Sequence, residues 1–281
     1  MSSKVYVTII RPANCLIASA AVVIAGLVAV GYSVLELGRL IDLLLASLVV
    51  FLFVGAGNTL NDYFDYEVDR INHPERPIPS GLIARRNAMT YAIILFLPTF
   101  VLALLVGVES FLVVLISGAV MASYERRLKR RGFLGNLQIS WLVALLFLFG
   151  GLAVYEGDAK ILARVAALSV MAFLATLGRE ITKDIEDVRG DRNRTTLPMS
   201  VGVRNSAYIA QLFYAAAVVV SLIVFHLGVL GRFYLWSVLV ADAVFLVSAV
   251  SVFRNPTMSS RLSKVAMVLA LLAFLLGVLV V

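Results

Sequence analysis

The chain has 281 residues, of which 61% are hydrophobic and only 15% are charged, far below the quarter that is usual in soluble domains. This composition excludes an ordinary soluble protein and predicts an all-α integral membrane protein. In such a protein, the formal charge of +7 reflects membrane topology and contact with anionic lipid headgroups rather than nucleic-acid binding. The single cysteine, Cys15, excludes an internal disulfide and a metal site made of several cysteines.

Nine apolar runs predict nine membrane-spanning helices, because about 20 helical residues cross the roughly 30 Å of hydrocarbon in a bilayer. The expected spans are Ala13–Val30, Leu43–Tyr63, Ala88–Val108, Phe111–Tyr124, Leu134–Val154, Ile161–Lys183, Ser206–Leu227, Phe233–Phe253 and Ser263–Val281. The fourth is the shortest, and Pro98 is expected to kink the third or to free a carbonyl there. We therefore expect a polytopic helical bundle that forms a single membrane-embedded domain over residues 1–281.

The basic residues are distributed unevenly between the two ends of these spans. If the N-terminus is cytoplasmic, only four of the 24 basic residues lie on the outer side, namely Arg39, Lys160, Arg164 and Arg232. Cytoplasmic loops of membrane proteins are enriched in Lys and Arg. The sequence therefore predicts a multi-pass protein of the cell membrane with a cytoplasmic N-terminus.

The second span ends in a group of acidic residues. Asp62, Asp65 and Asp69 are spaced by three and four positions, which places them on one face of a helix, and Asn61 lies one turn before Asp65. Neighbouring carboxylates repel one another, and at a helix C-terminus they also oppose the macrodipole. A bound cation is therefore expected, and the alternative is a polar helix end solvated at the membrane surface.

A second acidic motif follows the sixth span. Asp184, Asp187 and Asp191 repeat the spacing of three and four, and an arginine follows the last aspartate of each motif, Arg70 in the first and Arg192 in the second. Both motifs end spans that run inward, so we expect them on the cytoplasmic side at the same depth. Two matched motifs, one in each of two loose halves of the chain, predict one shared cation site.

The chemistry of the two motifs favours Mg²⁺ as the cofactor. Carboxylate and amide oxygens without His or Cys are typical ligands of a hard divalent cation, and Mg²⁺ is usually shared with phosphate groups of a substrate. Basic side chains beside such a site would bind a diphosphate. The candidates are Arg70, Arg76, Lys129, Lys183, Arg192 and Arg194. For each of them alone, the alternative is a solvated or lipid-contacting loop cation.

A site of this kind at the end of an apolar helical bundle suggests a lipid diphosphate as substrate. The metal and the basic residues would stabilise the departing diphosphate, which is a role in the transition state. If the lipid is allylic, a nucleophile can capture the carbocation that remains. The apolar helices would hold the lipid tail and exclude water.

The segments NDYFDYEVDR and KDIEDVRGDR resemble the two signatures of the UbiA superfamily of intramembrane prenyltransferases. The family patterns are Asn-Asp-x-x-Asp-x-x-x-Asp early in the chain and Asp-x-x-Asp-x-x-x-Asp late. The resemblance extends to the layout of the spans, the segment RPIPSG and the stretch LKRRGFLGN after the fourth span. It implies Mg²⁺-dependent transfer of a prenyl group from an allylic diphosphate to a lipophilic acceptor in the membrane.

The resemblance also implies a role for each motif residue. By this resemblance, the metal is expected to be bound by Asn61 and by the catalytic residues Asp65, Asp69, Asp187 and Asp191. Asp62 and Asp184 are expected to support these metal ligands. Lys129, Arg70 and Arg76 are expected to contact the diphosphate.

The acceptor is predicted mainly from Arg179. Family members with aromatic or quinone-type acceptors often carry Tyr one turn before the motif lysine, whereas this chain has Arg179 one turn before Lys183. An arginine suits an anionic acceptor, and Arg11 and Asn14 are further candidates for its pocket. The pattern is similar to that of the archaeal members that transfer geranylgeranyl from its diphosphate to the hydroxyl of geranylgeranylglycerol phosphate, an ether-lipid precursor. Glu180 is expected to form an ion pair with Lys183 or Arg179 in preference to acting as a base.

Two other functions compete with this expectation. The first keeps the prenyl diphosphate but uses an aromatic or quinone-type acceptor. The second is a membrane cation transporter, since carboxylates inside membranes can mark an ion path. Both motifs lie at one surface rather than at the midplane, and the middle of the spans lacks charge apart from Asp242, which favours the enzyme.

Overall fold

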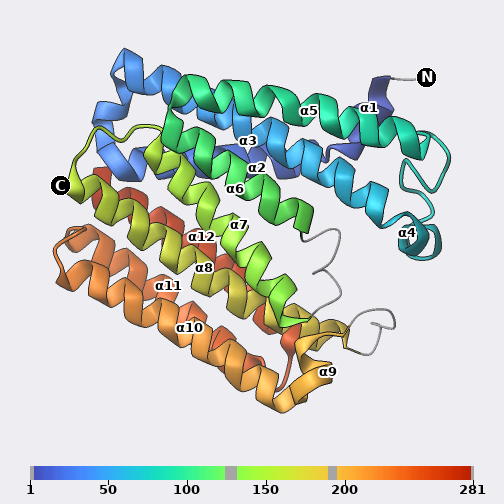
Figure 1. The fold of residues 1–281 in the computed structure, drawn as a ribbon. Helices are drawn as coiled ribbons and strands as arrows, with labels where there is room; N and C mark the ends of the chain where they lie inside the picture. Colours follow the sequence, from blue (N-terminus) through green and yellow to red (C-terminus); the bar gives the residue numbers. More distant parts are fainter. Residues whose placement is uncertain (1–2, 124–131, 189–194, 280–281) are drawn as a thin grey trace.

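The computed structural model describes residues 3–123, 132–188 and 195–279, which form a bundle of long helices (Figure 1). The long helices are α2 (Pro12–Val30), α3 (Leu37–Phe64), α5 (Arg85–Val106), α6 (Val108–Ser123), α7 (Phe133–Leu152), α8 (Ala159–Asp187), α10 (Val203–His226), α11 (Arg232–Ser251) and α12 (Pro256–Leu279). The short ones are α1 (Ser3–Ile9), the 3-10 helix η1 (Gly31–Leu35), α4 (Tyr66–Asn72) and α9 (Leu197–Val201).

The predicted spans are confirmed in number and order within the described residues. Eight helices are long and apolar enough to cross a membrane, and the helix at the fourth position, α6, is shorter at 16 residues, as the sequence predicts. The chain is an integral membrane protein. Helix ends differ from the expected spans because polar residues continue several helices: α3 begins at Leu37, α12 begins at Pro256 and α8 continues to Asp187.

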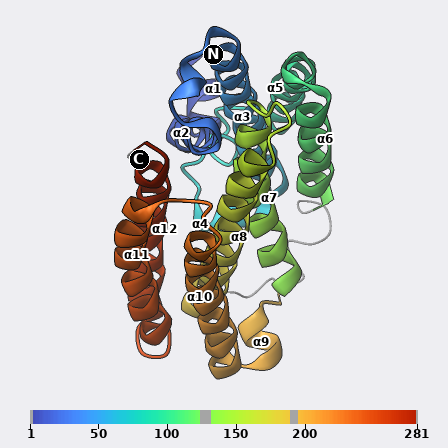
Figure 2. The ribbon, with the colours of Figure 1, turned by 90° about the vertical axis from the view of Figure 1, so that its left-hand side faces the viewer.

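The helices are arranged in two groups with α7 and α8 between them. Figures 1 and 2 show α1 to α6 on one side and α9 to α12 on the other. Helix α2 packs against α3, α7 and α8, and α12 packs against α2, α8 and α11, so the last helix closes the bundle against the first long one. The described ends of the chain lie at opposite ends of the bundle in Figure 1, as expected for an odd number of crossings.

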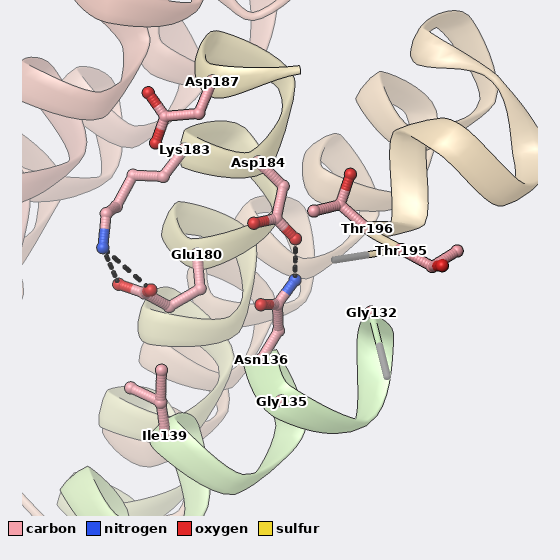
Figure 3. A pocket seen from close by; sticks show the side chains of 10 residues that line it. All are labelled: Gly132, Gly135, Asn136, Ile139, Glu180, Lys183, Asp184, Asp187, Thr195 and Thr196. Carbon is pink, nitrogen blue, oxygen red and sulfur yellow. Dashed lines mark hydrogen bonds and ion pairs between the residues drawn. The ribbon is translucent and has the colours of Figure 1, made fainter. Parts of the chain in front are cut away.

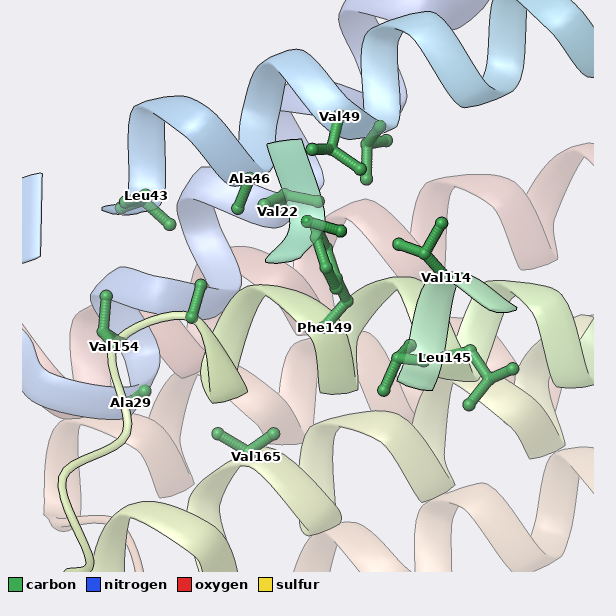
Figure 4. Close-up of a cluster of buried hydrophobic side chains, with 14 of the residues drawn as sticks. Val22, Ala29, Leu43, Ala46, Val49, Val114, Leu145, Phe149, Val154 and Val165 are labelled. Carbon is green, nitrogen blue, oxygen red and sulfur yellow. The ribbon is translucent and has the colours of Figure 1, made fainter. Parts of the chain in front are cut away.

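One apolar cluster joins the first group of helices to α7 and α8 (Figure 4). Val22 from α2, Val49 from α3 and Phe149 from α7 are each at most 2% exposed in it. Val114 from α6 and Val165 from α8 complete the same cluster. Because side chains from α2, α3, α6, α7 and α8 all meet here, the cluster fixes the positions of α3 and α8, whose C-terminal ends carry the acidic motifs.

Close helix packing depends on Gly150 and Gly151 in α7. A Cβ atom added at Gly150 would lie 2.5 Å from the carbonyl oxygen of Val22 and 2.9 Å from the Cβ atom of Ala25, both in α2. A Cβ atom at Gly151 would overlap the side chain of Val165 in α8. Small residues of this kind allow helix backbones to approach one another in membranes.

Replacing Gly150 with Ala is therefore expected to destabilise the protein by about 1–3 kcal/mol, the usual cost of overpacking. The unfolding temperature in detergent would fall. Gly38→Ala is the matched control, because Gly38 lies in the first turn of α3 with no atom within 4 Å of an added Cβ. Equal unfolding temperatures for the two variants would contradict the packing argument.

Candidate functional site

The first acidic motif lies where α3 continues into α4. The amide of Asp65 donates to the carbonyl of Asn61 at 2.9 Å, and the amide of Asp69 donates to the carbonyl of Asp65 at 2.8 Å. Helical hydrogen bonding therefore passes through the junction at Asp65, and α4 continues beyond Tyr63, where the second predicted span ends. Asn61, Asp65 and Asp69 are spaced by one turn each, as the sequence predicts.

Two carboxylates of this motif are buried and paired with arginines. Asp62 is 2% exposed and Asp69 is 3% exposed. Arg76 Nη1 lies 2.6 Å from both carboxylate oxygens of Asp69 and 3.9 Å from Oδ1 of Asp62, which shows that the two carboxylates share one face. The guanidinium of Arg11 donates to Oδ1 of Asp62. Buried charges cost on the order of several kcal/mol unless they are paired, so these ion pairs offset part of the cost of burying both carboxylates.

The two arginines are brought to the motif by packing between segments that are distant in the sequence. Arg11 links α1 to α2 with a φ angle of 52°, which is unusual for a residue other than glycine. Asn58 in α3 donates to the carbonyl of Ile10 at 2.8 Å and so holds this link against the motif helix. Ile78 and Ile83, which flank the Pro-Ser-Gly turn after Arg76, pack in one buried cluster with Ile10.

The second motif lines a cavity of about 80 Å³ between α7, α8 and the segment before α9 (Figure 3). This volume holds several water molecules or a small hydrated group. Asp184 is 6% exposed and accepts a hydrogen bond from Nδ2 of Asn136 in α7 at 2.8 Å. Asp187, the last residue of α8, is exposed and lines the same cavity.

Glu180 forms the ion pairs that the sequence favours. Its carboxylate lies 2.9 Å from Lys183 Nζ and 3.2 Å from Arg179 Nη1, and the side chain is buried. Figure 3 shows Lys183 turned toward Glu180, while Asp184 points toward Asn136. Glu180 therefore holds two basic side chains beside the second motif.

Other predicted site residues have different surroundings. Arg70 is exposed on α4, 4.0 Å from Glu67. Asn14 is exposed in the first turn of α2. Lys129, Asp191, Arg192 and Arg194 lie outside the described residues.

Two residues at the site were given no metal-, diphosphate- or acceptor-binding role from the sequence. Asn136 holds Asp184, and its position in the stretch LKRRGFLGN is the only sequence signal for it. Arg85 donates to the carbonyl of Tyr63 at 3.2 Å and lies 4.5 Å above the Tyr63 ring, so it caps the end of α3. Nothing in the sequence pairs Arg85 with Tyr63, because their contact depends on the turn between them.

The two motifs lie at the same end of the bundle, since the C-terminal ends of α3 and α8 both point to the right-hand side of Figure 1. Their donors are hard oxygen atoms, which fit Mg²⁺. Among the described residues, no three His, Cys, Asp or Glu side chains form a complete metal site.

The comparisons with known proteins agree with this geometry. The profile of the UbiA prenyltransferase family matches residues 19–276. The chain is 42% identical over 280 residues to digeranylgeranylglyceryl phosphate synthase of Methanothermobacter thermautotrophicus, covering 97% of this chain and 95% of that one. It is 38% identical over 287 residues to the protein of the same name in Thermococcus kodakarensis, with 100% of both chains covered.

Solved structures show the same fold. One that describes digeranylgeranylglyceryl phosphate synthase in membranes is 32% identical and superposes with a TM-score of 0.86, covering 99% of both chains. A UbiA homologue from Archaeoglobus fulgidus, bound to GPP and Mg²⁺, is 17% identical with a TM-score of 0.69, covering 96% of this chain and 99% of the other. The chain therefore belongs to the UbiA prenyltransferase family.

Proposed function

We propose that the protein transfers a geranylgeranyl group from geranylgeranyl diphosphate to the hydroxyl of geranylgeranylglycerol phosphate, with Mg²⁺ as cofactor. The observation that carries this proposal is a pair of acidic motifs at one end of an apolar bundle, in a chain 42% identical over nearly its whole length to a digeranylgeranylglyceryl phosphate synthase. In the reaction, the bond between C1 of the prenyl group and the diphosphate oxygen breaks, and its electron pair leaves with the diphosphate. The acceptor oxygen then bonds to C1 and loses its proton.

We assign the metal to carboxylates from both motifs. Asn61, Asp65, Asp69, Asp187 and Asp191 would hold Mg²⁺ directly, and Asp62 and Asp184 would support them. Bound there, Mg²⁺ would neutralise charge that develops on the departing diphosphate. The basic side chains proposed to bind the same diphosphate are Arg70, Arg76, Lys129, Lys183 and Arg192. Donors that are already in place stabilise this charge without reorganising during the reaction.

Arg179 is the proposed acceptor-binding residue. Its side chain is 26% exposed and sits one turn before Lys183 on α8. Within the described part of the chain its Nε atom is buried and has no hydrogen-bond partner. A phosphate on the acceptor would supply an acceptor oxygen for this guanidinium. Glu180 would position Arg179 and Lys183 rather than take a proton, and Arg11 and Asn14 would extend the acceptor pocket.

We place the enzyme in the cell membrane, with the N-terminus and the active site on the cytoplasmic side. The excess of Lys and Arg at this end of the helices supports that orientation. We also propose that residues 1–281 act as one membrane-embedded domain, because the site takes residues from both halves of the chain.

An acceptor assay tests the proposed function. Purified protein with Mg²⁺ and geranylgeranyl diphosphate should convert geranylgeranylglycerol phosphate to a product with two geranylgeranyl chains, detected by mass spectrometry. Removing Mg²⁺ with EDTA should stop the conversion. Product formed only with an aromatic or quinone-type acceptor would overturn the acceptor assignment. Mg²⁺ flux in liposomes, lost in Asp65→Ala and unaccompanied by prenyl transfer, would favour a transporter.

Replacing Asn136 with Ala should lower kcat/KM for prenyl transfer by about 10- to 100-fold, the range seen when the partner of a metal ligand is removed. The reason is that Asp184 would lose the amide that orients its carboxylate. Asn205→Ala is the matched control: its Nδ2 also donates at 2.8 Å, but from the exposed first turn of α10 to the carbonyl of Val201, the last residue of α9. Equal kcat/KM values for the two variants would contradict the role of Asn136.

A further inference from the structure

Two arginines occupy the carboxylates that are proposed to bind or support the metal. Arg76 Nη1 is 2.6 Å from each carboxylate oxygen of Asp69, so both oxygens of this ligand are engaged. Arg11 donates to Oδ1 of Asp62, and Arg76 is also within 3.9 Å of that atom. The first motif thus carries its own counter-ions in this structure.

We propose that Arg76 exchanges partners during substrate binding: it leaves the carboxylate of Asp69 as Mg²⁺ arrives and takes the diphosphate in its place. This inference rests on the proposed function, because it takes Asp69 as a metal ligand. The new element is that the guanidinium of Arg76 competes with Mg²⁺ for Asp69 before the diphosphate binds. After the diphosphate has bound, the same guanidinium helps Mg²⁺ to hold it.

The burial of Asp69 makes this competition strong. Its side chain is 4% exposed, whereas Arg76 is 27% exposed and lies in the connection between α4 and α5. Removing the positive partner from a carboxylate buried to this degree is strongly unfavourable. Mg²⁺ can use the oxygens of Asp69 only if Arg76 moves away, and Arg76 can then keep a partner only if another anion is present.

Mg²⁺ and diphosphate should therefore bind cooperatively. Diphosphate alone would have to draw Arg76 away from Asp69 and leave that carboxylate unpaired, and Mg²⁺ alone would leave the guanidinium unpaired. Both costs disappear when the two bind together. In addition, Mg²⁺ is commonly held by one or two carboxylates together with substrate phosphates, so diphosphate oxygens would add ligands to its shell.

Arg11 is attached to the backbone differently from Arg76. It stands at the strained link between α1 and α2, which Asn58 holds through the carbonyl of Ile10. Arg11 therefore stays on Asp62 in our account, and the exchange is assigned to Arg76.

The test measures the binding affinities of the purified protein for Mg²⁺ and for inorganic diphosphate in separate calorimetric titrations. The diphosphate titration is done in EDTA. In Arg76→Gln, affinity for Mg²⁺ alone should rise by about tenfold, and affinity for diphosphate alone should fall by about tenfold, within the usual range of coupling between sites. Affinity changes of opposite sign indicate the partner exchange, because a merely structural role of Arg76 would weaken the binding of both ligands. Arg86→Gln is the control, since it removes the same charge from the exposed first turn of α5.

Arg76→Lys provides a second variant if Arg76→Gln does not fold. Lysine keeps the charge but lacks the planar guanidinium, so both affinities should shift in the same directions as in Arg76→Gln and by less. Suppose that the unmodified protein binds Mg²⁺ and diphosphate together, but the affinity for Mg²⁺ is unchanged or lower in the folded variants. This result would overturn the proposed partner exchange of Arg76 and leave the proposed function standing. If the unmodified protein binds neither ligand even when both are present, the proposed function fails as well.

Discussion

Replacing Asp187 with Asn is expected to reduce prenyl transfer by at least about 100-fold, the scale on which loss of one charge-stabilising group lowers kcat. Asp187 is the last residue of α8 and lines the cavity of the second motif. An amide of the same shape cannot neutralise Mg²⁺ as a carboxylate does. Because the side chain is exposed, the substitution should leave the unfolding temperature nearly unchanged, so lost activity would report on the site.

Glu186→Gln is the matched control for this variant. Glu186 is the adjacent residue on α8 and is also exposed, but its carboxylate accepts a hydrogen bond from Thr257 Oγ1 at 2.8 Å at the start of α12. The same charge is removed one residue away from the cavity. If kcat falls equally in both variants, net charge rather than a metal ligand explains the loss. Full activity in Asp187→Asn, and likewise in Asp65→Ala, would refute the shared metal site.

Replacing Arg179 with Tyr is expected to raise KM for the phosphorylated acceptor by about 30-fold or more, because a guanidinium–phosphate pair that is largely shielded from water contributes at least about 2 kcal/mol. KM for geranylgeranyl diphosphate should change far less. The fold should tolerate the change, since Glu180 keeps its ion pair with Lys183 at 2.9 Å. Steady-state kinetics with each substrate varied in turn would separate the two effects.

Arg204→Gln is a suitable control for Arg179→Tyr. Arg204 lies in the first turn of α10 and stacks on the Tyr208 ring at 5.9 Å, outside the cavity of the second motif. Its loss should leave both KM values unchanged. If Arg179→Tyr raises KM for donor and acceptor equally, Arg179 does not select the acceptor.

The number and order of the membrane-spanning helices could be predicted from the sequence, because each span is determined locally by its own apolar run. The order of the long helices follows from these runs, and the short fourth span corresponds to α6. Helix ends were harder to predict, since polar residues such as Lys183 and Asp184 extend α8 beyond its apolar part. Hydrogen bonding through Asp65 likewise continues the helical chain into α4, beyond the expected end of the second span at Tyr63.

The parts of the site that could be predicted are those formed by residues close together in the sequence. The spacing of the aspartates predicts that Asp62 and Asp69 share a face, and Arg76 contacts both. The pairing of Arg11 with Asp62 and of Asn136 with Asp184 could not be predicted, because each joins helices that are distant in the sequence. Packing between α1, α2 and α3, and between α7 and α8, decides these contacts.

Anomalous diffraction from crystals grown with Mn²⁺ and geranylgeranyl S-thiolodiphosphate, an unreactive donor, tests the central claim most directly, because Mn²⁺ accepts the same oxygen ligands as Mg²⁺. Our account predicts metal density against carboxylates of both motifs, Asp65 or Asp69 on one side and Asp187 on the other, with the diphosphate between them. Metal bound by one motif alone, or density away from both, would contradict it.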